Sequence, residues 1–172
     1  MAIILGVDPG SRKTGYGIIE AVGDKLRYID CGVIRLPDGT LPERLKQIAA
    51  GLNDIIQIHC PTQASVEEVF MSNNPSSALK LGQARGAAIV AAVQNDLAVS
   101  EYTARQIKQS VVGSGAADKD QVQYMIRLLL KLDFNPQEDA ADALAAAVCH
   151  AHSQQTLIRM SGAQRDARRR IR

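Results

Sequence analysis

Four carboxylates from three distant segments are the side chains best suited to chemistry in this chain. Asp8 ends a short apolar run that is typical of a buried strand, and Glu67 and Glu68 end a second such run. Asp139 and Asp142 are three residues apart, so they share one face of a predicted helix. Carboxylates without partners are costly to desolvate, which favours a shared cation.

Each acid also has a plain structural explanation. Asp8 could close a turn, and Glu67 or Glu68 could cap a solvated strand end. The helix dipole would favour Asp139 near a helix N-terminus. Because successive strand residues point to opposite faces, at most one of Glu67 and Glu68 enters a shared site, and the residues alone leave open which.

A site of four carboxylates favours Mg²⁺ or Mn²⁺ as its cation. All-oxygen ligand sets suit these ions, and the three histidines lack zinc-ligand spacing with the cysteines. Two such ions close together are suited to in-line displacement at phosphorus, where they activate water and stabilise the leaving oxygen. We therefore expect phosphoryl chemistry with two metals per site.

The elements that must position these acids are readable from periodicity and turn signals. Thr40 and Glu43 form a capping box, and Asp118 and Gln121 can cap a later helix. The predicted strands cover 2–8, 14–22, 25–35, 62–70 and 97–102, and the predicted helices begin near 41, 77, 118 and 138, the second ending near 94 and the last near 152. This order predicts an α/β fold with a central mixed sheet of about five strands, the first three a meander, flanked by helices.

Length and charge suggest one domain with an appended tail. The chain has 172 residues, the usual size of a single domain. Residues 1–150 hold 14 Lys and Arg against 17 Asp and Glu, whereas residues 151–172 hold six Arg and one Asp. We predict a folded domain over 1–152 and a basic, disordered tail over 153–172.

Composition excludes several other classes of protein. Hydrophobic residues make up 46% and charged residues 22%, which is ordinary globular usage and rules out a wholly disordered chain. The three cysteines are far apart and form no CxxC pair, so neither a zinc ribbon nor a disulfide scaffold is expected. No basic leader and no long apolar span is present, and we predict a cytoplasmic protein.

Several motifs together resemble one known family. These are GVDPGSRKTGYGII at the start, then VEEVF, SALKLGQARGAAIVAA, ARQIKQSVVGSGAADKDQV and NPQEDAADALA. In this order they closely resemble the RuvC family of Holliday junction resolvases, members of the ribonuclease H-like superfamily, over about residues 2–152. The fold expected from this resemblance is therefore ribonuclease H-like.

The resemblance also implies roles for individual residues. It assigns Asp8, Glu67, Asp139 and Asp142 to the catalytic, metal-binding site, so Glu67 rather than Glu68 is the strand acid. It implies that Phe70 acts against unpaired bases at the junction centre, and that Lys108 and Lys119 contact DNA beside the site. Arg85 is a further candidate for contact with DNA phosphate.

The function implied is a homodimeric, Mg²⁺-dependent endonuclease, with Mn²⁺ as a possible substitute. Its substrate would be a four-way DNA junction, cut by paired symmetric nicks that leave 5′-phosphate and 3′-hydroxyl ends, in recombination and repair. The resemblance also implies cooperation with the RuvA and RuvB branch-migration complex. Because the body of the chain is mildly acidic, DNA binding requires Lys and Arg to cluster on one face.

Two alternatives from other classes remain open at this stage. The GVDPG loop also resembles the phosphate loop of sugar kinases and actin-like ATPases, although those proteins need a second related half. A junction-binding module without catalysis is the other alternative. The Gly- and Ala-rich helix near 77–94 either packs on the sheet alone or also meets a partner subunit.

Overall fold

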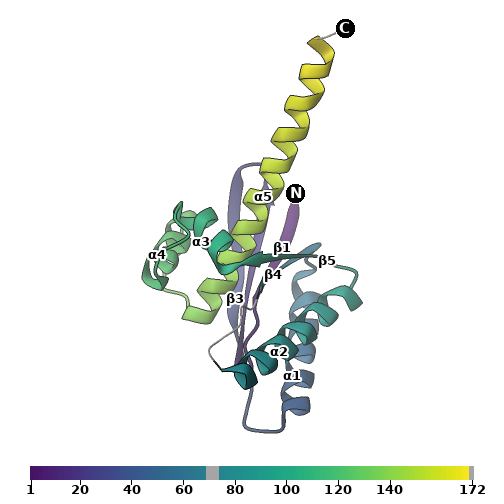
Figure 1. The fold of residues 1–172 in the computed structure, drawn as a ribbon, viewed down its shortest axis with the longest axis vertical. Coiled ribbons are helices and arrows are strands. Elements are labelled where there is room, and N and C mark those ends of the chain that lie inside the picture. The colour runs from purple at the N-terminus through teal and green to yellow at the C-terminus, as the bar shows by residue number, and fades with distance from the viewer. Residues whose placement is uncertain (69–73, 171–172) are drawn as a thin grey trace.

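A computed structural model gives the fold and describes residues 1–68 and 74–170, with side chains described through residue 161. These residues form five strands and five helices, and Figure 1 shows how they are arranged. Their order is β1 (Ala2–Asp8), β2 (Lys13–Val22), β3 (Lys25–Arg35), α1 (Leu41–His59), β4 (Gln63–Glu68), α2 (Pro75–Gln94), β5 (Ala98–Thr103), α3 (Ala104–Val112), α4 (Lys119–Leu129) and α5 (Glu138–Arg170).

The strands form one mixed sheet in the order β3-β2-β1-β4-β5. The first three strands are an antiparallel meander, and β4 and β5 join β1 in parallel, each through a helical crossover. Gly23 has a φ of 56° in the tight turn between β2 and β3, a conformation that glycine adopts without steric cost. The predicted α/β class, with its meander and mixed five-stranded sheet, is confirmed.

Helices cover both faces of the sheet and bury a separate core on each. Leu5, Val7 and Val66 pack with α1 and α2 on one face, whereas Ile4 and Ile19 pack with α3, α4 and α5 on the other. The alternation of Ile4, Leu5 and Val7 between the two clusters follows the two-residue period of a strand. Figure 1 shows α1 and α2 on one side of the sheet and α3, α4 and α5 on the other. The covered sheet gives the site residues a rigid frame.

Helix α3 is not among the predicted elements. The sequence did contain a signal for the start of this helix, the capping-box pair Thr103 and Gln106. In the structure, Gln106 N donates to Thr103 Oγ1 over 3.2 Å. The helix buries only Ile107 and Val111, so its apolar pattern is short. The capping boxes at Thr40 and Asp118 are confirmed at the starts of α1 and α4.

Helix α5 is longer than predicted. It continues past residue 152 to Arg170, where the sequence suggested a disordered tail (Figure 1). Gln155 Nε2 donates to the Gly23 carbonyl oxygen over 2.6 Å, and Arg159 Nη2 contacts Asp24 Oδ1 at 2.7 Å. These contacts hold the part of α5 that follows residue 152 against the β2–β3 hairpin, and composition alone did not reveal them. The division into domain and tail stays a prediction.

Even α5, with 33 residues the longest helix, is not apolar enough to cross a membrane, and the same holds for each helix in the described ranges.

Candidate active site

The carboxyl ends of β1 and β4 bring two of the predicted acids together. The strands run in parallel with Val7 opposite Val66, so Asp8 and Glu67 follow as neighbours at the same edge of the sheet. This edge, where parallel strands end, is the usual place for a ligand site in an open α/β sheet. The prediction that these two acids meet is therefore confirmed.

The strand pattern decides between Glu67 and Glu68. Ser65 Oγ donates to the Ala146 carbonyl oxygen over 2.7 Å, so Ser65 faces α5, whereas Val66 packs into the core beneath α1 and α2. Glu67 shares the face of Ser65, and Glu68 shares the face of Val66. Glu67 is thus the acid directed toward α5, as the resemblance implied.

Close contact between α5 and the sheet positions the remaining two acids. A Cβ atom at Gly6 would lie 1.9 Å from the Ala143 carbonyl oxygen, and one at Gly15 would lie 1.9 Å from the Asp139 carbonyl oxygen. Glycine at these strand positions lets the helix backbone rest directly on β1 and β2. The first turns of α5, which carry Asp139 and Asp142, are therefore held over the end of β1.

Carboxylates and lysines line one cavity of about 260 Å³ at this edge. The acids are Asp8, Glu67 and Asp142, and the cations are Lys108 from α3 and Lys119 from α4. A second cavity of about 380 Å³ adjoins it on the α2 side, where Glu68 and Leu81 join Asp8 and Glu67 in the lining. Three of the four predicted acids and two predicted DNA-contacting lysines thus line one cavity.

Burial, together with repulsion between the acids, raises the pKa values of the carboxyl groups at this cavity. Burial and the charges of Glu67, Asp142 and Asp139 raise the pKa of Asp8 to about 8. Burial and Asp142 raise the pKa of Glu67 to about 7, against opposing effects of the two lysines. Burial also raises the pKa of Asp142. Asp139 does not line the cavity, yet it lies close enough to act on Asp8 and Asp142.

Basic side chains converge on the start of α5 beside the acids. Lys119 forms an ion pair with Glu138, whose pKa this pair and nearby Lys13 lower. Arg35 Nη2 donates to Gln137 Oε1 at 3.5 Å. The expected gathering of cations next to the acids is therefore found in part, drawn from β2, β3, α3 and α4. The sequence offered no sign of the contact between Lys119 and Glu138, because 19 residues separate them.

The donor set fits a hard divalent cation. It consists of carboxylate oxygens around one cavity, and their raised pKa values mean that positive charge there is favourable. Among the residues described, no three side chains of His, Cys, Asp or Glu are already arranged to hold a metal ion. The acids therefore surround a shared space, and metal binding requires their side chains to converge on it.

Two predicted DNA contacts are not brought to this cavity. Phe70 lies outside the described residues. Arg85 does not line the cavity and instead pairs with Glu101 of β5, beyond β4 from β1. The roles of Phe70 and Arg85 stay predictions.

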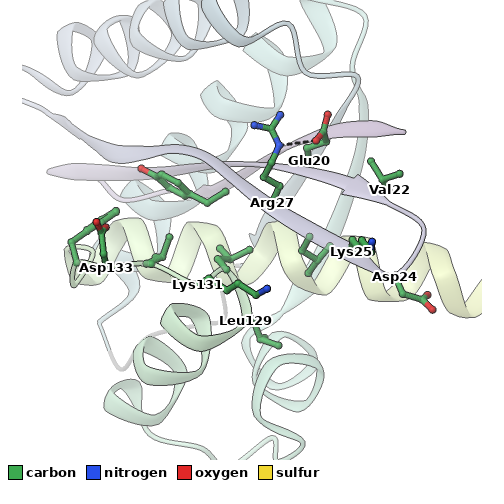
Figure 2. A pocket seen from close by; sticks show the side chains of 13 residues that line it. Glu20, Val22, Asp24, Lys25, Arg27, Leu129, Lys131 and Asp133 are labelled. Carbon is green, nitrogen blue, oxygen red and sulfur yellow. Dashed lines mark hydrogen bonds and ion pairs between the residues drawn. The ribbon is translucent and has the colours of Figure 1, made fainter.

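The largest of the cavities described here, about 880 Å³, lies away from the acids (Figure 2). It runs between the β2–β3 hairpin and the segment that joins α4 to α5. Two of its three acids are already in ion pairs, Glu20 with Arg27 at 2.8 Å and Asp24 with Arg159. Figure 2 shows the pair of Glu20 and Arg27. Size alone would have selected this groove, but two of its acids are paired with Arg, whereas burial and neighbouring acids raise the pKa values of Asp8 and Glu67 in the smaller cavity. The smaller cavity is therefore the candidate active site.

Known proteins match most of this chain. A family model described as crossover junction endodeoxyribonuclease RuvC matches residues 4–150. The crossover junction endodeoxyribonuclease RuvC of Acinetobacter baylyi is 63% identical over 161 residues, which cover 94% of this chain and 89% of that protein. The protein of the same description from a Psychrobacter species is 62% identical over 165 residues, 93% of this chain and 85% of that one.

A solved structure extends the likeness to three dimensions. The RuvC of T. thermophilus, in complex with a Holliday junction substrate, superposes with a TM-score of 0.84 at 32% identity, covering 91% of this chain and 96% of that one. The family match spans the strands and the helix start that carry all four acids. The chain therefore belongs to the RuvC family of crossover junction endodeoxyribonucleases.

Proposed function

We propose that this protein resolves four-way DNA junctions by Mg²⁺-dependent hydrolysis of two phosphodiester bonds. The observation that carries the proposal is the cavity in which Asp8, Glu67 and Asp142 meet Lys108 and Lys119 at the carboxyl edge of the sheet. Family membership gives the reaction class, an endodeoxyribonuclease acting at crossover junctions.

The four carboxylates are the proposed ligands of two divalent cations. When bound, these cations would lower the pKa of the attacking water and stabilise the leaving 3′-oxygen. Asp8 sits centrally, since the other three acids all act on it, and it is the acid best placed to contact both cations. Glu67 approaches from β4, and Asp139 and Asp142 approach from α5. The expected products carry a 5′-phosphate and a 3′-hydroxyl.

Lys108 and Lys119 are the proposed contacts to the scissile strand. Both ammonium groups act on Glu67 and Asp142, so they lie within electrostatic reach of the reacting phosphate. A cation there stabilises the charge that develops in the transition state. Phe70 and Arg85 are proposed as further DNA contacts on the family resemblance alone.

The exposed face of α2 supports a homodimer. Leu79, Val90 and Val93 are 70%, 52% and 55% exposed, and the buried residues Ala84, Ala88 and Ala91 are on the opposite face. Gly82 and Gly86 lie on the exposed face, with no neighbouring atom within 4 Å of an added Cβ. An apolar face with small residues admits close approach of a second helix, and two-fold symmetry matches a substrate that needs two nicks.

Two further assignments come from the resemblance only. We propose that the protein acts with the RuvA and RuvB branch-migration complex, and that it works in the cytoplasm on recombining DNA.

The test compares a mobile four-way junction with a linear duplex of equal length, each end-labelled and incubated with EDTA, Ca²⁺ or Mg²⁺. Paired, religatable nicks in the junction alone, with Mg²⁺ alone, are the expected result. Asp8→Asn should abolish cleavage and leave junction binding near intact. Binding without cleavage in Mg²⁺ or Mn²⁺ would identify a non-catalytic junction-binding module instead, and no preference for the junction would contradict the proposal altogether.

A further inference from the structure

We propose that Glu138 is a positioning residue for Lys119, holding its ammonium group at the rim of the carboxylate cavity. The inference rests on the proposed nuclease function and adds to it a residue that does not itself line that cavity. Its basis is the ion pair that joins the first residue of α4 to the first residue of α5.

The two helix starts fix where this pair can form. Asp118 caps α4, with Gln121 N donating to Asp118 Oδ1 over 2.8 Å, so the backbone that carries Lys119 is rigid. Glu138 begins α5, which is held against β1 and β2 by the close glycine contacts. The side chains of Lys119 and Glu138 therefore meet from two helix starts whose positions these contacts fix.

Lys119 stands between two adjacent cavities. It lines the catalytic cavity with Asp8 and Glu67, and it also lines a neighbouring cavity of about 280 Å³ with Glu138 and Asp120. Asp142 is the other residue that lines both. Glu138 thus holds the ammonium group from the side away from Asp8.

The position of the Lys119 ammonium group matters because two environments compete for it, the catalytic cavity and the carboxylate of Glu138. Beside divalent cations in the catalytic cavity an ammonium group is repelled by like charge, and Glu138 offers it a carboxylate just outside. Without Glu138, Lys119 can turn toward the acids or toward any DNA phosphate. With it, Lys119 stays where the scissile phosphate must arrive.

The pair has little to do with folding. The Lys119 and Glu138 side chains are 66% and 62% exposed, and ion pairs that open to water contribute little to stability. Variants at Glu138 should therefore fold, which makes the proposal testable.

The experiment measures single-turnover junction cleavage in Mg²⁺ and junction binding in EDTA for the full chain. Glu138→Gln should slow cleavage about threefold to fivefold, the upper range for an ion pair that is open to water. Metal-free binding should tighten severalfold, and its salt dependence should steepen by about one unit in log K against log salt, because Lys119 is released to a phosphate. Glu138→Asp, which keeps the charge, should recover most of the cleavage rate.

A double-mutant cycle separates this role from general effects. In a Lys119→Met background, Glu138→Gln should change cleavage no further. Asp120→Asn removes an acid from the same neighbouring cavity and should leave the cleavage rate unchanged. Wild-type cleavage by Glu138→Gln, or an equal loss in the Lys119→Met background, would overturn the proposal. If the wild-type protein does not cleave at all, the nuclease function fails, and the binding measurements alone decide the role of Glu138.

Discussion

At the scale of single residues, the site is defined by carboxylates that keep their protons to an unusually high pH. Burial and three neighbouring acids raise the pKa of Asp8 to about 8, and Glu67 follows at about 7. A cation that binds these groups must displace their protons, so affinity for it depends on pH. The family resemblance indicates which acids bind the cation. Their burial and the neighbouring acids make the affinity for that cation depend on pH.

The first prediction concerns Mg²⁺ affinity. Because Asp8 and Glu67 hold protons near pH 6.5 and lose them by pH 8.5, the apparent affinity for Mg²⁺ should rise across this interval, by about tenfold for each unit of pH per proton released. Calorimetry in buffers of different ionisation enthalpy measures the number of protons released. Affinity that stays constant over this interval would contradict the shared site. Lys25→Ala, in the larger groove beside the β2–β3 hairpin and outside the catalytic cavity, serves as the control.

The second prediction concerns stability without metal. A carboxyl with a raised folded-state pKa binds more protons folded than unfolded, so stability falls as pH rises from the unfolded pKa near 4 to the folded pKa near 8. Asp8→Asn removes this loss. In EDTA at pH 8 it should raise the free energy of unfolding by about 1–3 kcal/mol. Near pH 4 the difference should vanish, and urea unfolding at both values checks it.

At the scale of elements, the sequence predicted what depends on local pattern. An apolar run followed by two runs rich in Tyr, Ile and Val, with a turn at Gly23-Asp24 between them, located the meander. The capping boxes located the starts of α1 and α4. Helix α3 was not predicted because only Ile107 and Val111 are buried along it, which is too short an apolar pattern to show a helical period. The continuation of α5 was not predicted because its anchors, Gly23 and Asp24, lie over 130 residues away in the chain.

The candidate site, like the helices and strands, could be predicted from local sequence pattern but not where it depends on contacts between distant residues. Residue types and family motifs identified the four acids and both lysines, but spacing alone could not choose Glu67 over Glu68. That choice depends on which face of β4 meets α5, shown by the contact of Ser65 with Ala146. The ion pair of Lys119 with Glu138 is a tertiary contact between two helix starts, for which local pattern holds no signal.

The third prediction belongs to the packing of α5 on β1. In Gly6→Ala the new Cβ would meet backbone atoms of Ala143 and Ala147, which cannot move without shifting the helix. We expect a loss of about 2–4 kcal/mol in the free energy of unfolding, at or above the upper end for overpacked cores. Cleavage should fall further than stability explains, because Asp139 and Asp142 move away from Asp8.

Gly32→Ala is the matched control for this variant. Gly32 also lies in a strand, but its added Cβ would meet only the ring end of Tyr16, a side chain that can turn aside. Its cost should be clearly smaller and its cleavage rate near that of the wild type. Equal effects of the two variants would show that the contact of α5 with the backbone of β1 does not set the site.

At the scale of the whole molecule, the helices beside the candidate site and the helix that we propose for dimerisation cover opposite faces of one sheet. Helices α3, α4 and α5 carry the lysines and two of the acids, whereas α2 on the other face exposes its apolar stripe. Association through α2 would leave the helices around each catalytic cavity uncovered. Resolution of a junction needs two nicks at symmetric positions, which a single copy has only one site to make.

The fourth prediction follows from that separation. Val90→Asp places a charge in the middle of the exposed face of α2, where burial against a second copy would leave it desolvated and unpaired. The variant should sediment as a monomer where the wild type sediments as a dimer. Each monomer keeps a complete set of acids, so residual single nicks should persist while paired nicking is lost.

Leu128→Asp, at a residue 53% exposed on α4, should change neither mass nor nicking. If Val90→Asp still has the mass of a dimer, the dimer interface lies elsewhere. If Val90→Asp is a monomer and still makes paired nicks, junction resolution does not require a symmetric dimer.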